Sequence, residues 1–226
     1  TQDDNDGSAT YSIKDVTFTN QGYTGSYIIF NPASTTPALT TDAWQAYSGS
    51  KYAACFDAST PPNDDWLISP QMTFGKYPRI SFFAKSVTDQ YGLERFKVLY
   101  STDATNWYYL AGDATTYIEA PVDWTVFEYP VPGLSSTSGY IAIQCLSNDA
   151  FVFMVDDFVA GSTDYVYAVQ GGYWSDPNTW STGVVPDSAD DVLIPDGVTV
   201  IVDSDRVTYD PSYDGLYDYE NQANAG

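Results

Sequence analysis

Two pairs of adjacent aspartates stand beside apolar, strand-like runs in this chain. Asp64-Asp65 precedes Trp66-Leu67-Ile68, and Asp156-Asp157 follows Phe153-Met154-Val155. Carboxylates placed against such runs cost free energy unless hydrogen bonds or a cation compensate them. A bound cation is a simple compensation here, because only 8 Lys and Arg face 30 Asp and Glu. The four aspartates are therefore the candidate ligands of a metal ion.

The spacing of these acids argues against catalysis. Neighbouring side chains of a strand point to opposite faces, so only one of Asp156 and Asp157 is expected to face the core side. Adjacent carboxylates are then poorly placed to act as general acid and base on one substrate. The chain also has no histidine, which excludes Ser-His-Asp triads, Cys-His dyads and most zinc sites. We expect no enzyme activity.

Calcium is the cation that suits these residues. It takes about 6–8 oxygen ligands at about 2.3–2.6 Å, from carboxylates and backbone carbonyls, and a loop that converges on an inward strand acid supplies such a set. Two alternatives stay open. Asp64 and Asp65 could be solvated turn acids or a cap on the next strand, and Asp156 or Asp157 could be a lone acid hydrogen-bonded to backbone amides.

Aromatic side chains are the other candidate chemistry. Sugars stack on exposed Trp and Tyr rings while nearby Asp, Asn and Gln bind their hydroxyls. Trp44, Tyr108, Tyr109 and Trp124 lie in or beside polar loops and are the candidate ligand-binding residues. A tyrosine-rich β-protein also exposes many rings without function. Trp66 and Trp107 are instead expected to be buried.

Composition excludes several classes of protein. A hydrophobic share of 43% with 16% aromatics supports a packed core rather than global disorder. The net charge of −22 repels nucleic acid and anionic membranes and is typical of an extracellular setting. No apolar run approaches the roughly 20 residues that a membrane helix needs. We therefore expect no nucleic-acid partner and no membrane insertion.

The elements that must position these residues are β-strands. Short runs rich in Tyr, Phe, Val and Ile alternate with Gly, Pro, Asn and Asp clusters, which predicts an all-β protein built as a two-sheet sandwich. The expected strands cover residues 11–18, 27–30, 52–56, 66–68, 79–85, 95–101, 107–111, 125–130, 140–146 and 151–159. Cys55 and Cys145 lie in two of these runs and are expected to be buried thiols, with an inter-strand disulfide as the alternative.

The chain is expected to contain two β units. Residues 1–10 form a polar lead-in, residues 11–161 the sandwich domain, and residues 162–226 a partial second β unit with a Tyr/Asp-rich tail after Val207. No signal peptide is recognisable, so we expect a mature or trimmed chain that is part of a larger multidomain protein.

Four segments occur in an order that resembles a known family: Asp65-Trp66-Leu67-Ile68-Ser69-Pro70, Ile80-Ser81-Phe82-Phe83-Ala84-Lys85-Ser86, Val98-Leu99-Tyr100-Ser101-Thr102-Asp103 with Trp107, and Val155-Asp156-Asp157-Phe158. They resemble the cleaved-adhesin and choice-of-anchor J modules of secreted Bacteroidetes surface proteins, distant relatives of MAM-type jelly rolls. The resemblance implies a jelly-roll β-sandwich, usually calcium-bound and non-catalytic. The family's Asp-rich loop before the first Trp is reduced here to Asp42. The segment Trp174-Ser175-Asp176-Pro177 with Trp180 is similar to the first turn of β-helical surface regions.

These observations predict a non-catalytic, extracellular, calcium-stabilised β-sandwich that mediates adhesion or ligand binding at a bacterial cell surface, with a glycan or a surface protein as partner. The alternative is a carbohydrate-binding accessory module of a secreted glycan-degrading enzyme. An enzyme that uses carboxylates from different strands ranks last.

Overall fold

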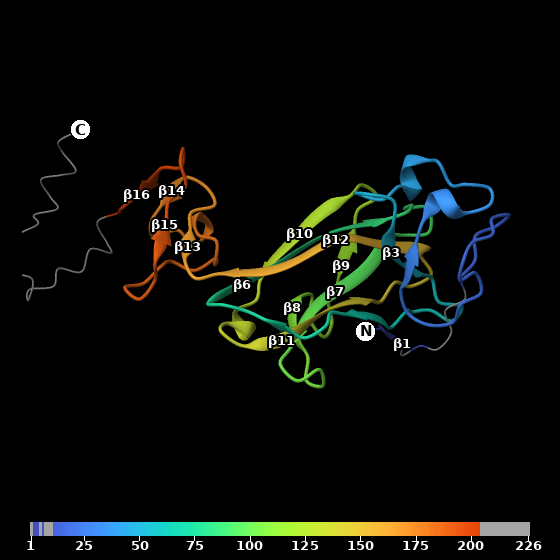
Figure 1. Cartoon of the computed structure of the whole chain (residues 1–226), viewed down its shortest axis with the longest axis horizontal. Coiled ribbons are helices and arrows are strands. Elements are labelled where there is room, and N and C mark those ends of the chain that lie inside the picture. Colours follow the sequence, from blue (N-terminus) through green and yellow to red (C-terminus); the bar gives the residue numbers. More distant parts are fainter. Residues whose placement is uncertain (1, 5, 7–10, 204–226) are drawn as a thin grey trace, which may run out of the picture. The chain divides into compact units, whose positions relative to one another are not determined.

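The computed structural model describes residues 2–4, 6 and 11–203 and divides the chain into two units, Thr1–Tyr165 and Val166–Gly226 (Figure 1). The expected boundary lay four residues earlier because the last strand of the first unit runs on to Thr163. The Tyr/Asp-rich tail lies outside the described residues. No helix in the described part is long and apolar enough to cross a membrane.

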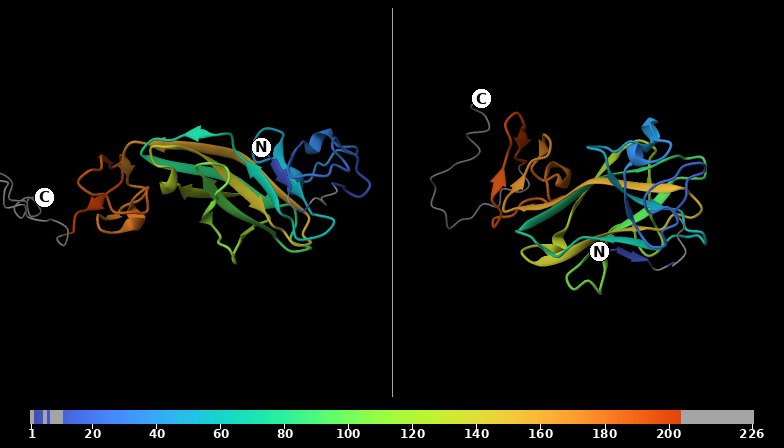
Figure 2. Two further views of the ribbon diagram at one scale, coloured as in Figure 1. Left: turned by 90° about the horizontal axis from the view of Figure 1, so that it is seen from below. Right: turned by 45° about the vertical axis from the view of Figure 1, so that its right-hand side comes forward.

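The first unit is an antiparallel β-sandwich. One sheet consists of β1 (Gln2–Asp4), β4 (Asp65–Ile68), β5 (Met72–Thr73), β7 (Glu94–Ser101), β8 (Tyr108–Ala111), β9 (Ile118–Ala120) and β11 (Ser138–Cys145). The other has the order β10 (Thr125–Pro130), β6 (Tyr77–Ser86), β12 (Val152–Thr163), β3 (Tyr52–Phe56) and β2 (Ile28–Phe30). The right-hand view of Figure 2 shows the two sheets as separate layers. The jelly-roll β-sandwich expected from the sequence is confirmed.

Strand alternation builds the core between the sheets. In β6, Ile80, Phe82 and Ala84 are buried, whereas the residues between them are partly exposed. Phe96 of β7 packs against Phe82 at a ring-centroid distance of 6.0 Å and against Phe153 of β12 at 5.1 Å. Each of these rings bridges the two sheets, and removing a buried Phe of this kind costs about 3–5 kcal/mol.

A second core lies on the outer face of the five-stranded sheet. The chain from Tyr11 to Trp44 folds over one end of that sheet through two short 3-10 helices, η1 (Pro32–Ser34) and η2 (Asp42–Trp44). Phe30, Trp44 and Met154 are buried there. Because both faces of β12 are covered at this end, its residues from Val152 to Val155 are all buried, which explains the unbroken apolar run.

The segment 11–18 was expected to be a strand and is not. It makes only isolated bridges, Ile13 with Val16 and Thr17 with Thr36. Asp15 and Asn20 have positive φ angles of 59° and 70°, and these turns break the extended conformation. The Tyr11 ring still turns inward and is fully buried, so the apolar pattern marked packing rather than a strand.

Both cysteines are buried free thiols. Cys55 of β3 and Cys145 of β11 belong to the core between the sheets. Burial, followed by the neighbouring Cys145 and Asp65, raises the pKa of the Cys55 thiol well above its usual value. The Cys55 thiol therefore stays protonated, and both buried cysteines behave as small apolar side chains.

The second unit is small. It contains β13 (Val166–Tyr167), β14 (Gly172–Tyr173), the 3-10 helix η4 (Pro177–Thr179), β15 (Val192–Leu193) and β16 (Val200–Ile201). Its two strand pairs are parallel, and Trp174 packs edge-on against the buried Trp180 at 4.7 Å. The expected small C-terminal β extension is present, while the likeness to a β-helix stays a prediction.

Candidate functional site

The first acid pair joins strands inside the sandwich. Asp65 is fully buried at the start of β4, and its Oδ2 accepts hydrogen bonds from Asn63 Nδ2 at 2.7 Å and Cys55 Sγ at 3.2 Å. Asp64 points to the other side, where its Oδ1 accepts from Trp66 Nε1 at 2.8 Å and Gln144 Nε2 at 2.6 Å. The pair therefore connects β4 to β3 and β11, and the solvated-turn interpretation does not hold for Asp65.

The second acid pair lies in a β-bulge of β12. The register against β6 shifts between Asp156 and Val159, and Asp157 has a φ of 46°. Asp156 Oδ2 accepts from the backbone N–H groups of Tyr47 at 3.0 Å and Ser48 at 3.2 Å, and Asp157 Oδ1 accepts from Ser48 Oγ at 2.7 Å. Both acids thus contact one loop. The expectation that they serve opposite faces is wrong because the bulge interrupts strand alternation.

These surroundings test the fit of a calcium ion. Among the described residues, no three Asp, Glu, His or Cys side chains converge where they could hold a metal ion. The groups around Asp156 are N–H donors rather than oxygen ligands, and its Oδ1 accepts a further bond from Asp157 N at 2.8 Å. This matches the alternative of an acid hydrogen-bonded to backbone amides. Calcium at Asp156, Asp157, Asp64 or Asp65 stays a prediction.

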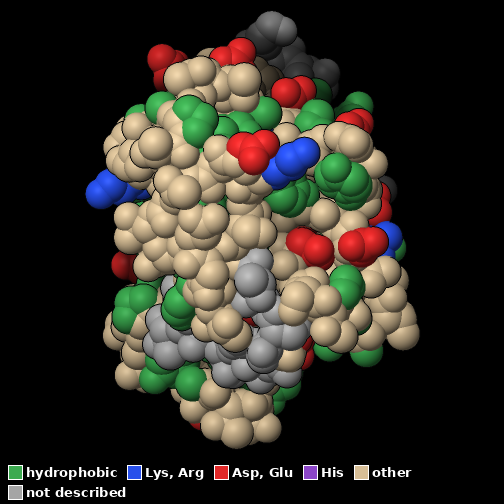
Figure 3. Space-filling view, turned by 90° about the vertical axis from the view of Figure 1, so that its right-hand side faces the viewer, with side chains coloured by type: hydrophobic (Ala, Val, Ile, Leu, Met, Phe, Trp, Pro, Cys, Tyr) green, Lys and Arg blue, Asp and Glu red, His purple; other side chains and the backbone are tan. Residues whose placement is uncertain are grey.

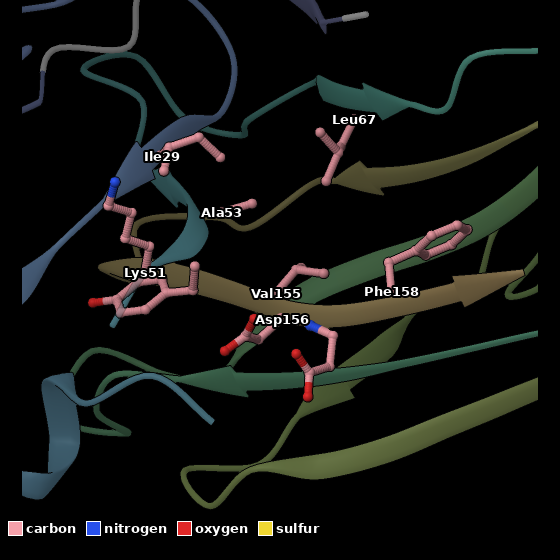
Figure 4. A pocket seen from close by; sticks show the side chains of 9 residues that line it. Ile29, Lys51, Ala53, Leu67, Val155, Asp156 and Phe158 are labelled. Atoms are coloured by element: carbon pink, nitrogen blue, oxygen red, sulfur yellow. Dashed lines mark hydrogen bonds between the residues drawn. The ribbon is translucent and has the colours of Figure 1, made fainter. Parts of the chain in front are cut away.

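A small pocket adjoins the bulge. Figure 4 shows Ile29 and Leu67 on one side of this pocket and Asp156 on the opposite side, with Phe158 nearby. Its volume is about 200 Å³, below the roughly 300–1,000 Å³ of small-molecule sites. The pocket is therefore too small to be the main candidate.

Trp44 is not available to a ligand. It is only 9% exposed and packs against Phe30 at 5.9 Å and Phe151 at 5.8 Å. The short helix η2 turns its ring into the second core although the surrounding sequence is polar. The prediction of Trp44 as a ligand-binding residue is corrected accordingly.

Tyr108 and Tyr109 are exposed, by 53% and 46%, on β8 of the seven-stranded sheet. Tyr108 stacks on Tyr100 at 5.4 Å, and Lys97 Nζ lies 5.4 Å from the centre of the Tyr109 ring. Trp124 precedes β10 of the other sheet. The four predicted aromatic residues therefore do not form one platform.

Trp66 and Trp107 are less buried than expected. Both are half-buried and belong to neither core. Their rings contact each other at 5.4 Å, and strand alternation places Trp66 on the outer side of the seven-stranded sheet, because the neighbouring Leu67 packs toward the core.

Trp124 belongs to an aromatic cluster on the outer face of the five-stranded sheet. Tyr47 stacks on Phe83 at 3.5 Å with an interplanar angle of 14°. The Trp124 ring meets Tyr47 edge-on at 6.3 Å and Tyr52 at 6.1 Å. Its Nε1 donates to Gln45 O at 3.0 Å, which fixes the ring orientation. The half-buried Trp124 and the 47%-exposed Tyr47 leave aromatic surface open to solvent.

A larger pocket lies beside Trp124. Its volume is about 500 Å³, and we call it the Lys85 pocket; it is lined by Asp42, Ala43, Lys85, Val87, Thr88, Asp89, Val122, Asp123 and Trp124. Lys85 is only 4% exposed, and its Nζ lies 5.9 Å from the centre of the Trp124 ring. Its ammonium forms no hydrogen bond or ion pair with any residue that the structure describes. Asp42, Asp89 and Asp123 stand exposed at the rim.

The Lys85 pocket combines opposing electrostatic effects. Burial lowers the pKa of the Lys85 ammonium, while Asp123 and Asp42 act in the opposite direction.

Of the residues around this pocket, only Trp124 was predicted from the sequence as a ligand-binding residue. Lys85 and Phe83 could have been found from alternation in β6, because Ile80, Phe82 and Ala84 mark the inward face and leave the intervening residues on the outer face.

The face in Figure 3 shows Asp and Glu side chains recurring among neutral ones, with few Lys and Arg. A basic side chain held inside a pocket is therefore unusual in this chain.

Neither a protein-family model nor a curated protein matches the chain. Solved structures do align with it. The K1 cleaved adhesin domain of Lys-gingipain from Porphyromonas gingivalis W83 matches with 13% identity over 61% of this chain and 84% of that chain, at a TM-score of 0.44. The K3 cleaved adhesin domain of the same protein matches with 17% identity over 61% and 91%, at 0.43. TmCBM61 in complex with β-1,4-galactotriose matches with 10% identity over 60% and 81%, at 0.42. At these scores the function must be argued from the chain's own residues.

Proposed function

We propose that this chain is a non-catalytic, extracellular carbohydrate-binding module that attaches a larger protein, or the cell bearing it, to a glycan. The observation that carries the proposal is the Lys85 pocket. Within one cavity it brings together an aromatic ring, a buried cation and three carboxylates. Attachment to a surface protein through the same face is the second candidate, and the exposed Tyr47 ring favours it.

The chemistry of the pocket suits a sugar. A pyranose presents an apolar face of C–H groups, which stacks on an aromatic ring, and a rim of hydroxyls, which need both donors and acceptors. Trp124 offers the ring, Lys85 the donor, and Asp42 and Asp123 the acceptors. The hydrogen bond from Trp124 to Gln45 O holds the ring in place before a ligand arrives, which lowers the entropic cost of binding.

The acids of the interior support a non-catalytic role. Asp65 and Glu94 are both buried, and each accepts hydrogen bonds from neighbouring protein groups. Those bonds serve packing. The chain has no histidine to act as a base, and the three acids around the Lys85 pocket stand exposed on its rim.

A calcium ion near the Asp156–Asp157 bulge is a further part of the proposal. The exposed Asp157 carboxylate and the resemblance to calcium-bound modules support it. Thermal melts with and without a chelator test the ion: a lower midpoint in chelator, abolished by Asp157→Asn, is expected. A melting midpoint that is unchanged by chelator would contradict the proposed calcium ion.

Glycan binding is tested with a glycan array followed by calorimetry on the highest-ranking ligand. Trp124→Ala is expected to weaken glycan binding about tenfold or more, because the sugar loses its contacts with both the face and the edge of the indole ring. Trp107→Ala is the matched control, because it also removes a half-buried indole but from the other sheet. Silence across the array, or equal loss in both variants, would contradict the proposal.

A further inference from the structure

We propose that Lys85 makes this site selective for neutral, hydroxyl-rich sugars and that the site discriminates against uronic acids of the same linkage. The inference rests on the proposed function and names the ligand class of its pocket. The observations behind it are the ammonium of Lys85 and the carboxylates that line the same pocket.

Lys85 places a hydrogen-bond donor in the pocket at the end of a largely buried side chain. Lys85 is only 4% exposed. Within the described part of the chain, its ammonium has neither a hydrogen bond nor an ion pair. Its contact with the protein is with the face of Trp124, at 5.9 Å, a distance at which cation–π attraction operates. The Nζ atom is not among the buried polar atoms that lack a partner, so it meets solvent in the pocket, where it is placed to donate to a ligand oxygen.

The surrounding acids decide which ligand oxygen is favoured. Asp42, Asp89 and Asp123 line the same pocket, so three carboxylates surround one ammonium. Asp123 and Asp42 raise the pKa of the Lys85 ammonium against the effect of burial, as expected of carboxylates that line the same pocket. The local charge is therefore negative, and a fourth carboxylate brought in by the ligand would meet more repulsion than attraction.

A neutral sugar satisfies every group of the pocket. One hydroxyl oxygen of the sugar accepts from Lys85 Nζ. The other hydroxyl groups donate to the rim carboxylates and, at the open side of the pocket, to water. The apolar ring face lies against Trp124, next to Val122. Vicinal hydroxyls have the donor–acceptor alternation that one ammonium among several carboxylates requires.

The test compares sugars that differ only at C6. An array of neutral β-1,4-linked gluco-, galacto- and manno-oligosaccharides is set beside the corresponding uronates, which carry a carboxylate in place of the hydroxymethyl group. We expect the neutral member of a bound pair to be preferred by at least about fivefold at low salt. The preference should narrow in high salt, because ions screen the repulsion from the rim carboxylates.

Variants separate this inference from the proposed function. Lys85→Met keeps the apolar stem and is expected to lower affinity for the neutral sugar by about tenfold to a hundredfold. Lys51→Met, an exposed lysine outside the pocket, is the matched control. Thermal melts check that both variants are folded, and NMR of the Lys85 Cε–Nζ group in the wild type should show a shift on adding the neutral sugar.

Each outcome has one meaning. Uronates bound more tightly than their neutral partners, or full affinity in a folded Lys85→Met, would overturn the selectivity while Trp124-dependent binding keeps the glycan function. Binding that survives both Trp124→Ala and Lys85→Met would place the glycan site elsewhere. No glycan binding at all would refute the proposed function itself.

Discussion

Asp65 and Lys85 are two of the acidic and basic side chains that the first unit buries, and they differ in what surrounds the polar group. Asp65 lies in the core between the sheets, where Asn63 and Cys55 donate to it. Lys85 lies on the outer face of the five-stranded sheet, in a pocket where no described residue accepts a hydrogen bond from it. A buried group whose hydrogen bonds are made inside the protein stabilises the fold, whereas an ammonium that faces a pocket without a hydrogen bond to the protein is available to a ligand.

Substitution at the two sites should have opposite effects on stability, and this is the largest effect we expect. Asp65→Ala removes the acceptor of two buried donors and leaves a cavity, which costs about 3 kcal/mol. Lys85→Met removes a charge whose burial Asp123 and Asp42 offset only in part and should raise the free energy of unfolding by about 1 kcal/mol. Urea denaturation of both variants measures the difference. A Lys85→Met protein as unstable as Asp65→Ala would show that Lys85 is structural.

Glu94 extends the comparison to pH. It is 1% exposed, and Phe151 N donates to its Oε1 at 2.7 Å. Burial raises its pKa to about 7, against a usual value of 4.5. The folded state therefore binds the proton more tightly, so this stabilisation is complete below pH 4.5 and is lost as pH rises through 7.

The size of that effect follows from the shift in pKa. The free energy of unfolding should fall by about 3 kcal/mol between pH 4.5 and pH 7.5 because of Glu94. Glu94→Gln should remove this part of the slope, and denaturation of both proteins across the pH range measures it. Parallel slopes in the wild type and the variant would show that the carboxyl titrates normally.

Much of the fold could be predicted from the sequence, because alternation in β6 and the apolar start of β12 report directly on burial. The site was harder to predict. Trp44 looked exposed because polar residues flank it, yet η2 turns it into a core whose other members lie far along the chain. The bulge at Asp157 broke an alternation argument that would have held in a regular strand. Lys85 was hidden inside an apolar strand, and only the folded structure shows that it faces a pocket.

The two cysteines test how tightly the core between the sheets is closed, and the expected effect is smaller. Cys55 and Cys145 are buried, so a thiol reagent should not modify them in the native protein and should modify both after unfolding. Timed reaction with a chromogenic disulfide, with and without denaturant, checks this. Fast reaction of either thiol in the folded protein would show that the core between the sheets opens more readily than its packing implies.

The most direct test of the account is an NMR titration of the isotope-labelled chain with the neutral oligosaccharide that binds best on the array. We expect shifts at the Trp124 indole N–H, at the Lys85 side chain and at the backbone of the pocket segments 87–89 and 122–124, with Trp66 and Trp107 unchanged. Shifts confined to Trp66, Trp107 and Tyr109 would contradict it and would move the binding site to the seven-stranded sheet.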